Sequence, residues 1–370
     1  MARNRVIYQS EALYVSSGVN ATTSGGHTQL ERVQSANYNF TINRQDVNQY
    51  GQLARLDSIV LEPPTVALDY SYYLTDGFNE RALGFYVQNP SSAAVGNFAS
   101  GHLADGSGRN LFVTAVAEGF DAQGKVGDQT QSVIGLGNAY LSNYGLELSV
   151  GAIPTVSVSM ECANINSTVT PTVTGNAAIT GIATPGVDIS AGTPLSGKVQ
   201  LKPAITGEST VTALRPGDIT VDITSFDDQT ISLLGGGDSI NIQSASLSLP
   251  LSRSPIQRLG SKFPFARVVD FPVAATLSIN AILTDITARN LAGVIDDTAK
   301  KNVSLTLKGT DGNTKMVYTL KNCVLDSESF SSSIGSNKSV DLTFSTQIGG
   351  PNDPDNGIFV SGANSSVPYV

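Results

Sequence analysis

The chain has 370 residues, of which 36 are glycine and only 14% are charged, and its net charge is −9. This length is enough for two domains with cores of their own, and the composition is typical of short strands joined by many turns. An acidic chain without a polybasic region argues against tight binding to phosphate backbones.

The chain lacks an apolar run of the length of a signal-peptide core or a membrane helix, so we expect no membrane partner. Two cysteines, Cys162 and Cys323, are too few for a disulfide framework. We therefore expect a chain that folds in a reducing cytosol, with both cysteines as small packed side chains.

In the first half, residues 36–42 and 66–74 alternate between apolar and polar side chains. Period-two alternation predicts strands with one buried and one wet face. The wet face consists of small polar side chains, which suit the smooth wall of a water-filled channel; a Ser/Thr-rich face of an ordinary β-sandwich is the alternative. The polar residues predicted to line such a lumen are Ser35, Asn37, Asn39, Thr41, Asp69 and Ser71.

The residues that follow predict a helix, a loop and two more strands. Thr75-Asp76 precedes apolar residues at helical spacing, which predicts a capped helix over residues 78–85. A Gly/Ser/Asn-rich loop follows at 86–108, and two further strands are predicted at 146–150 and 156–160.

The second half repeats the first. At an offset of 209, residues 33–84 align without gaps on 242–293, with twelve identical positions. Later segments align at offsets of 192, 178 and 184, so that Asn110 meets Asn302, Tyr140 meets Tyr318 and Val156 meets Val340. The 86–108 loop then carries 17 residues (209 − 192) that the second half lacks. A tandem duplication explains this match better than coincidence. It divides the chain into repeat 1 at 1–165, a Ser/Thr/Gly/Pro-rich connector at 166–204 and repeat 2 at 205–370.

Repeat 2 has the same predicted elements, with a helix over 288–295 and later strands at 318–325 and 340–344. The predicted fold is mainly β, with two tandem sheet or barrel domains that each carry one packed helix. We expect the apolar faces, with Tyr38, Phe40, Leu247 and Leu249, to pack beneath the helices. The lumen-lining residues predicted in repeat 2 are Ser244, Ser246, Ser248, Thr276, Ser278 and Asn280.

These features together resemble the tail tube, or major tail, proteins of long-tailed bacteriophages. The resemblance rests on Gln-Ser-Ala at 34–36 and 243–245, on the strand–Thr-Asp–helix units at 66–85 and 275–295, and on the hairpin around 145–161. It covers about two thirds of the chain and is most evident over 271–285, and no single motif is diagnostic.

The resemblance implies a structural virion protein of the phage tail, assembled in the host cytoplasm. Family members form hexameric rings whose sheets close into a 24-stranded barrel, and the rings stack into a tube that conducts DNA. A duplicated chain would need only three copies for one ring. The implied partners are further copies of the chain and tail sheath, terminator and baseplate proteins, while DNA passes without specific binding.

Residues able to carry chemistry are sparse. His27 and His102 have no partner at metal-ligand spacing and are expected in surface loops. Asp353, Asp355 and Asn356 could in principle bind calcium, but the Pro/Asn/Asp-rich pattern around them predicts a turn instead. We therefore expect no catalytic, cofactor or metal site and no enzyme activity. A tandem β-sandwich adhesion or decoration protein, and less readily a hydrolase on a β scaffold, remain the alternatives.

Contacts between stacked rings are predicted in segments outside the repeated core. These segments are residues 1–20, the extra loop within 86–108, and the tail from 349. The loop is expected to have no apolar face of its own and to become ordered by contact. Its candidate inter-ring residues are Ser91, Asn97, His102 and Asp105.

Overall fold

The protein is mainly β, which confirms the predicted fold class at that level. The computed structural model describes residues 11–16, 27–62, 64–91, 96–104, 108–116, 118, 122, 131–170, 177–178, 198–199, 214, 219–224, 241–257, 259, 264, 266–282, 301–309, 311–332 and 337–364.

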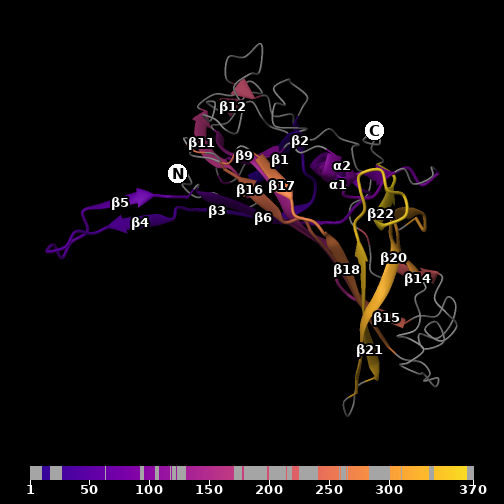
Figure 1. Ribbon diagram of the computed structural model, residues 1–370. Helices are drawn as coiled ribbons and strands as arrows, with labels where there is room; N and C mark the ends of the chain where they lie inside the picture. Colours follow the sequence, from indigo (N-terminus) through magenta and orange to yellow (C-terminus); the bar gives the residue numbers. More distant parts are fainter. Residues whose placement is uncertain are drawn as a thin grey trace.

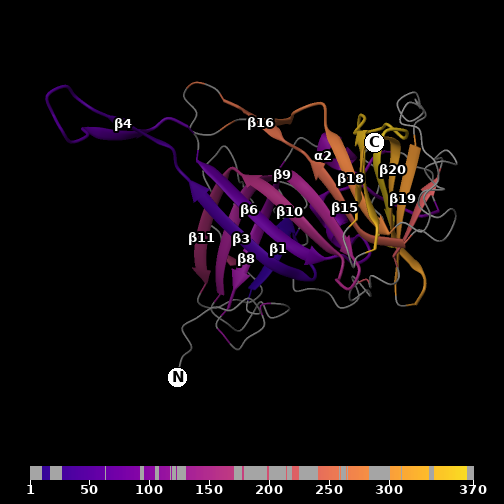
Figure 2. The same cartoon turned by 90° about the horizontal axis from the view of Figure 1, so that it is seen from below.

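Eight antiparallel strands form the main sheet, in the order β20-β21-β18-β15-β9-β10-β6-β3. Figure 2 shows six of them side by side in one broad sheet, from β3 in indigo through β6, β10, β9 and β15 to β18 in orange. Their bounds are β3 (Val33–Thr41), β6 (Thr65–Tyr73), β9 (Gln131–Ser149), β10 (Thr155–Cys162), β15 (Asn241–Pro250), β18 (Ala274–Ile282), β20 (Thr314–Ser331) and β21 (Ser339–Gln347).

The long strands β9 and β20 also continue into a second layer, where their N-terminal parts pair with other strands. One group around β9 consists of β1 (Glu11–Ser16), β2 (His27–Gln29), β8 (Arg109–Ala115) and β11 (Asn164–Thr170). The group around β20 consists of β14 (Ile219–Thr224), β19 (Lys301–Lys308), β22 (Gly357–Gly362) and β7 (Val87–Gln88).

Three separate hairpins complete the described strands. The β4–β5 hairpin extends away from the body in both views (Figures 1 and 2). A short hairpin, β12–β13, lies in the predicted connector. The bounds are β4 (Arg44–Val47), β5 (Asp57–Val60), β16 (Arg253–Ile256), β17 (Ala266–Val269), β12 (Ala177–Ala178) and β13 (Lys198–Val199).

The same strand pairings occur twice, at constant offsets. Hairpins β4–β5 and β16–β17 have bounds that differ by 209 at all four ends. The β8–β9 and β19–β20 ladders match when β8 is shifted by 192 and β9 by 184. Asn138 and Asn322, also 184 apart, both have a left-handed backbone, with φ of 51° and 56°. Asn adopts this conformation more readily than most residues. At this offset Tyr140 aligns with Val324, so the sequence alignment of Tyr140 on Tyr318 is wrong by six residues.

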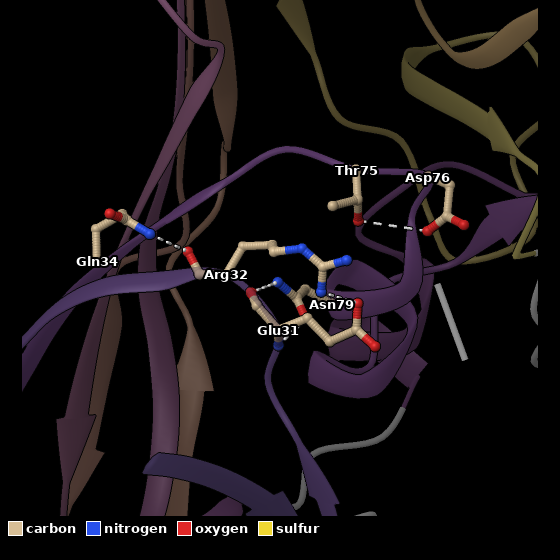
Figure 3. A network of polar contacts seen from close by, with 6 residues as sticks. All are labelled: Glu31, Arg32, Gln34, Thr75, Asp76 and Asn79. Carbon is tan, nitrogen blue, oxygen red and sulfur yellow. Dashed lines mark hydrogen bonds and ion pairs between the residues drawn. The ribbon is translucent and has the colours of Figure 1, made fainter. Parts of the chain in front are cut away.

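Two short helices, α1 (Phe78–Leu83) and α2 (Ser100–Ala104), lie next to each other in Figure 1. The helix predicted over 78–85 is confirmed, but its N-cap is Gly77 and no side chain caps it. Thr75 instead donates to Asp76, at 3.3 Å, in a buried corner (Figure 3). The α2 helix was not predicted, and the helix predicted over 288–295 lies outside the described residues.

The core lies between the main sheet and the second layer, where the apolar side chains of both are buried. Leu247 and Leu249 are buried there as predicted, whereas Tyr38 and Phe40 remain exposed by 37% and 59%. The prediction that they pack beneath a helix is therefore wrong within this chain. The reason is positional, because β3 is the last strand of the sheet.

Candidate assembly surfaces

One face of the main sheet carries polar side chains that are exposed or half-buried. Strand pairing places Asn37 opposite Asp69, and Asp69 opposite Ser159. Directly opposed residues point to the same side of a sheet, so polar rows continue from strand to strand. The twelve residues predicted to line a lumen all lie on this face and none is buried: Ser35, Asn37, Asn39, Thr41, Asp69, Ser71, Ser244, Ser246, Ser248, Thr276, Ser278 and Asn280.

The polar face continues across the main sheet from the strands of the first half of the chain to those of the second half. Ser246 lies between Glu147 on β9 and Ser278 on β18, and short hydrogen bonds join neighbouring side chains on the face. Ser35 and Ser71 hydroxyl oxygens are 2.7 Å apart, and the Asn280 amide donates to Asp341 at 2.6 Å. Small side chains bonded in this way give a smooth and wet surface.

The charge on the face is negative. Asp69, Glu147, Asp341 and Glu161 are exposed carboxylates on it, and the eight described strands place no Lys or Arg on it. Arg267 of β17 forms an ion pair with Glu161 and leaves the other three carboxylates uncompensated by it. A surface of this kind repels phosphate groups. That the face lines a channel stays a prediction.

The main sheet ends in two open edges. At one end β3 pairs only with β6, and at the other end residues 324–331 of β20 pair only with β21 among the described strands. Tyr38 and Phe40 on the first edge and Val324 and Phe330 on the second are exposed apolar residues. An exposed edge with apolar side chains is a template for pairing with another strand.

The two equivalent hairpins have different surroundings. Hairpin β16–β17 lies against repeat 1: the Arg253 guanidinium lies 5.1 Å from the Tyr140 ring centre and donates to the His102 carbonyl oxygen at 3.0 Å. Arg267 of the same hairpin forms an ion pair with Glu161. By contrast, residues 44–62 in and around β4–β5 are exposed apart from half-buried Val47 and Ser58.

The predicted inter-ring loop is largely internal over its described residues, 86–91, 96–104 and 108. Asn97 is buried and donates to the carbonyl oxygens of Gly349 and Gly350, at 3.3 and 2.9 Å. His102 on α2 is buried too, so the expectation of a surface-loop histidine is wrong. The loop has an apolar side of its own, because Phe98 packs in the core. Ser91 is exposed, and Asp105 lies outside the described residues.

A buried polar cluster, which the sequence did not reveal, joins α1 to both groups of strands. One Glu80 carboxylate oxygen accepts from the Tyr72 and Tyr144 hydroxyls at 2.8 and 3.2 Å, and Tyr144 bonds to Tyr318 at 2.8 Å. Burial raises the pKa of Glu80, and the bonds from the two tyrosines act in the opposite direction. The only sequence signal was tyrosine at apolar strand positions.

A second corner fixes the start of β3. Asn79 of α1 accepts from the Glu31 backbone nitrogen at 2.9 Å and donates to the Glu31 carbonyl oxygen at 2.8 Å (Figure 3). Arg32, in a left-handed conformation with φ 57°, then directs the chain into the strand. These contacts hold the β3 edge in a defined position relative to the core.

The residues considered for chemistry form no site in the described part of the chain, where no group of three or more His, Cys, Asp or Glu could hold a metal. Asp353 accepts from the backbone nitrogens of Asp355 and Asn356, which confirms the predicted turn. Cys162 and Cys323 are free and buried, as predicted. His27 begins β2, and its side chain is not described. None of the described helices has the length and apolarity to span a bilayer.

Comparisons with known proteins assign the chain to no family. No protein-family model matches the chain, and no curated protein matches it. Among solved structures, a baseplate chain of the anti-feeding prophage is 14% identical, covering 40% of this chain and 92% of its own, with a TM-score of 0.28. A chain of the tube-terminating cap of the same particle is 12% identical, covering 40% and 89%, with a TM-score of 0.27. Similarities at this level carry no argument about function.

Proposed function

We propose that this chain is a structural, non-enzymatic protein that forms rings of three copies, which stack into a tube for DNA, as in the phage tails whose tube proteins the sequence resembles. The observation that carries the proposal is a curved eight-strand sheet with one wet, acidic face and two open edges. Open edges that bear aromatic residues are satisfied when further copies continue the sheet.

The number of strands supports three copies. Eight strands from each chain give the 24 strands that the resemblance implies for one ring. The constant offsets of strand pairing support the proposed duplication, in which each repeat supplies four of the eight strands. A ring of three copies would then have approximate sixfold symmetry in its strands and true threefold symmetry in its chains.

The polar face supports a passive channel. Its acidic residues would repel the phosphate backbone, and its short hydroxyl and amide groups offer no cluster of positive charge that would retain DNA. In this proposal DNA passes without specific binding, and the protein contributes shape and charge but no chemistry. Sheath, terminator and baseplate proteins are the further partners that a tail would supply.

Contacts between rings are best assigned to the hairpin tips. Tyr50 and Leu53 at the tip of β4–β5 are fully exposed. Leu259, at the tip of the hairpin that is docked within the chain, is equally exposed, at 104%. Leu259 therefore stays exposed although its hairpin is docked, so Leu53 and Leu259 are both available for contact with the next ring.

Electron microscopy of the purified protein, combined with its mass in solution, tests the proposal. We expect rings or tubes with three chains per ring. Six whole chains per ring, or monomers at all concentrations, would overturn it. Stable monomers that bind a cell surface through Tyr50 and Leu53 would instead favour the adhesion or decoration protein.

A further inference from the structure

Within the main sheet, the chain already contains one junction between the four strands of its first half (β3, β6, β9 and β10) and the four of its second half (β15, β18, β20 and β21). Residues 143–149 of β9 pair antiparallel with 244–250 of β15, and Leu146 lies opposite Leu247. Both side chains are buried, at 1% and 2% exposure, so this pairing closes the apolar core across the junction. Arg253 and Arg267 then hold the following hairpin, β16–β17, against β9, α2 and β10.

The two open edges consist of the strands equivalent to this junction. Leu247 corresponds to Tyr38 at the offset of 209, and Leu146 corresponds to Phe330 at the offset of 184. The irregularities agree as well, because β9 has an extra residue against β10 at position 142 and β20 has one against β21 at 326, again 184 apart. The difference lies in exposure, since Tyr38 and Phe330 are 37% and 50% exposed.

We propose that β3 of one copy pairs antiparallel with residues 324–331 of a second copy, in the register of the internal junction. Tyr38 then lies opposite Phe330, Asn39 opposite Ser329 and Asn37 opposite Ser331. The inference rests on the proposed function for the existence of a ring, and it goes further by fixing the partner, the direction and the register of every inter-chain contact along this edge.

The β4–β5 hairpin then lies over the second copy as β16–β17 lies over its own chain. Arg44 holds the position of Arg253, while Val324 and Ser345 hold the positions of Tyr140 and Glu161. In the single chain, Val324 and Ser345 line an open surface pocket of about 380 Å³ that also contains Asp353. In this register the guanidinium of Arg44 fills the place that Arg253 fills in the internal junction, beside a pocket whose lining is polar and includes one carboxylate, Asp353.

Cysteine cross-linking of the full chain tests the register. The variant N37C/S331C places the two sulfurs on directly opposed residues of different copies, whose Cβ atoms are about 4.5–5.5 Å apart. A small backbone shift brings them to the roughly 3.5–4.5 Å of a disulfide. The pair S246C/E147C occupies the equivalent opposed positions inside one chain and is the positive control. The variant T41C/S331C is shifted by four residues along the same face and is the negative control.

On a non-reducing gel we expect N37C/S331C to move from monomer to dimer and trimer, while S246C/E147C stays a monomer and T41C/S331C does not cross-link. Mixing the single variants N37C and S331C should give dimers that neither gives alone. Rings seen by microscopy in which only the shifted pair cross-links, or neither pair does, would overturn the register and leave the proposed function intact. Monomers without rings would overturn both.

Discussion

Glu80 shows what a single buried carboxylate contributes to this fold. It is fully buried and accepts from two tyrosine hydroxyls, one of which continues to Tyr318. Replacing Glu80 by Ala leaves Tyr72 and Tyr144 without this acceptor, and we expect a loss of about 1–3 kcal/mol in the free energy of unfolding. Glu80→Gln keeps an acceptor of the same shape and cannot carry a charge in this buried position, so it should be at least as stable as the native chain near neutral pH. Denaturant unfolding of the two variants checks this, and a Gln variant as unstable as the Ala variant would contradict it.

His102 makes stability depend on pH in a predictable direction. Burial lowers its pKa to about 3, helped by the positive charges of Arg109 and Arg253. The unfolded chain has an ordinary histidine, with a pKa near 6.5, and so binds more protons between these two values. Stability should therefore fall as pH decreases from about 6.5 toward 3. We expect His102→Leu to make the melting temperature vary less over this window, as measured by thermal unfolding at several pH values. If the melting temperature of His102→Leu varies with pH as much as that of the native chain, the pH dependence comes from other groups and the prediction is wrong.

At the scale of elements, the two hairpins provide a matched experiment. Arg253 is buried and bonded within the chain, whereas its equivalent Arg44 is exposed. We expect Arg253→Ala to lower the stability of the isolated chain by about 2 kcal/mol, because a buried charged donor is lost. Arg44→Ala should leave that stability unchanged and weaken ring formation instead. Thermal unfolding and sedimentation of both variants separate the two effects, and equal loss of stability in both would contradict the assignment.

The hairpin tips give a further prediction. Replacing Leu53 and Leu259 by Ser removes apolar groups that are fully exposed in the single chain, so folding should be unaffected. If the tips join successive rings, the double variant should form single rings that do not elongate. Microscopy and sedimentation measure this, with Val150→Ser, another exposed apolar residue away from the hairpins, as the control. Tubes of normal length would exclude the tips as the contact.

The sequence predicted the strands that have one wet and one buried face, and it missed strands that are buried throughout or exposed almost throughout, such as β8 and the β4–β5 hairpin. Strands β3, β6, β15 and β18 alternate in polarity because one side of each lies on the polar face. Strand β8 is buried along its whole length and shows no alternation, so it was not predicted. Helix α2 has five residues, too few for a helical period to show.

The sequence predicted which side chains share a face of the sheet, but it did not predict which of them other parts of the fold cover. Alternation assigned the twelve polar residues to one face, because side-chain direction follows from position in a strand. It could not say that Tyr38 and Phe40 would lie uncovered, since that depends on which strand ends the sheet. Nor could it place Asn97 and His102 inside, because their burial depends on contacts with residues such as Gly350 and Arg253, far away in the sequence.

For the whole molecule, the charge of the polar face can be tested directly. Introducing lysine at Ser246 and Ser248 adds positive charge to a face on which the charged side chains of the described strands are all carboxylates. We expect assembled tubes to form normally and to retain DNA at low salt, and phage carrying the change to eject DNA more slowly. The control places the same two charges at Thr314 and Asn352, which are exposed elsewhere. Equal DNA retention by both variants would argue against a lumen on this face.

The internal β9–β15 junction has a consequence for how assembly responds to dilution. Because both of its strands belong to one chain, that ladder forms at an effective concentration fixed by the connecting chain and not by the amount of protein present. In the proposed ring, half of the six junctions are of this kind, and only the other three obey mass action between molecules. The covalent link also frees the two kinds of junction from having to share one sequence. Leucine against leucine closes the permanent junction, while tyrosine and phenylalanine, which the folded monomer tolerates at its surface, are left to close the reversible one.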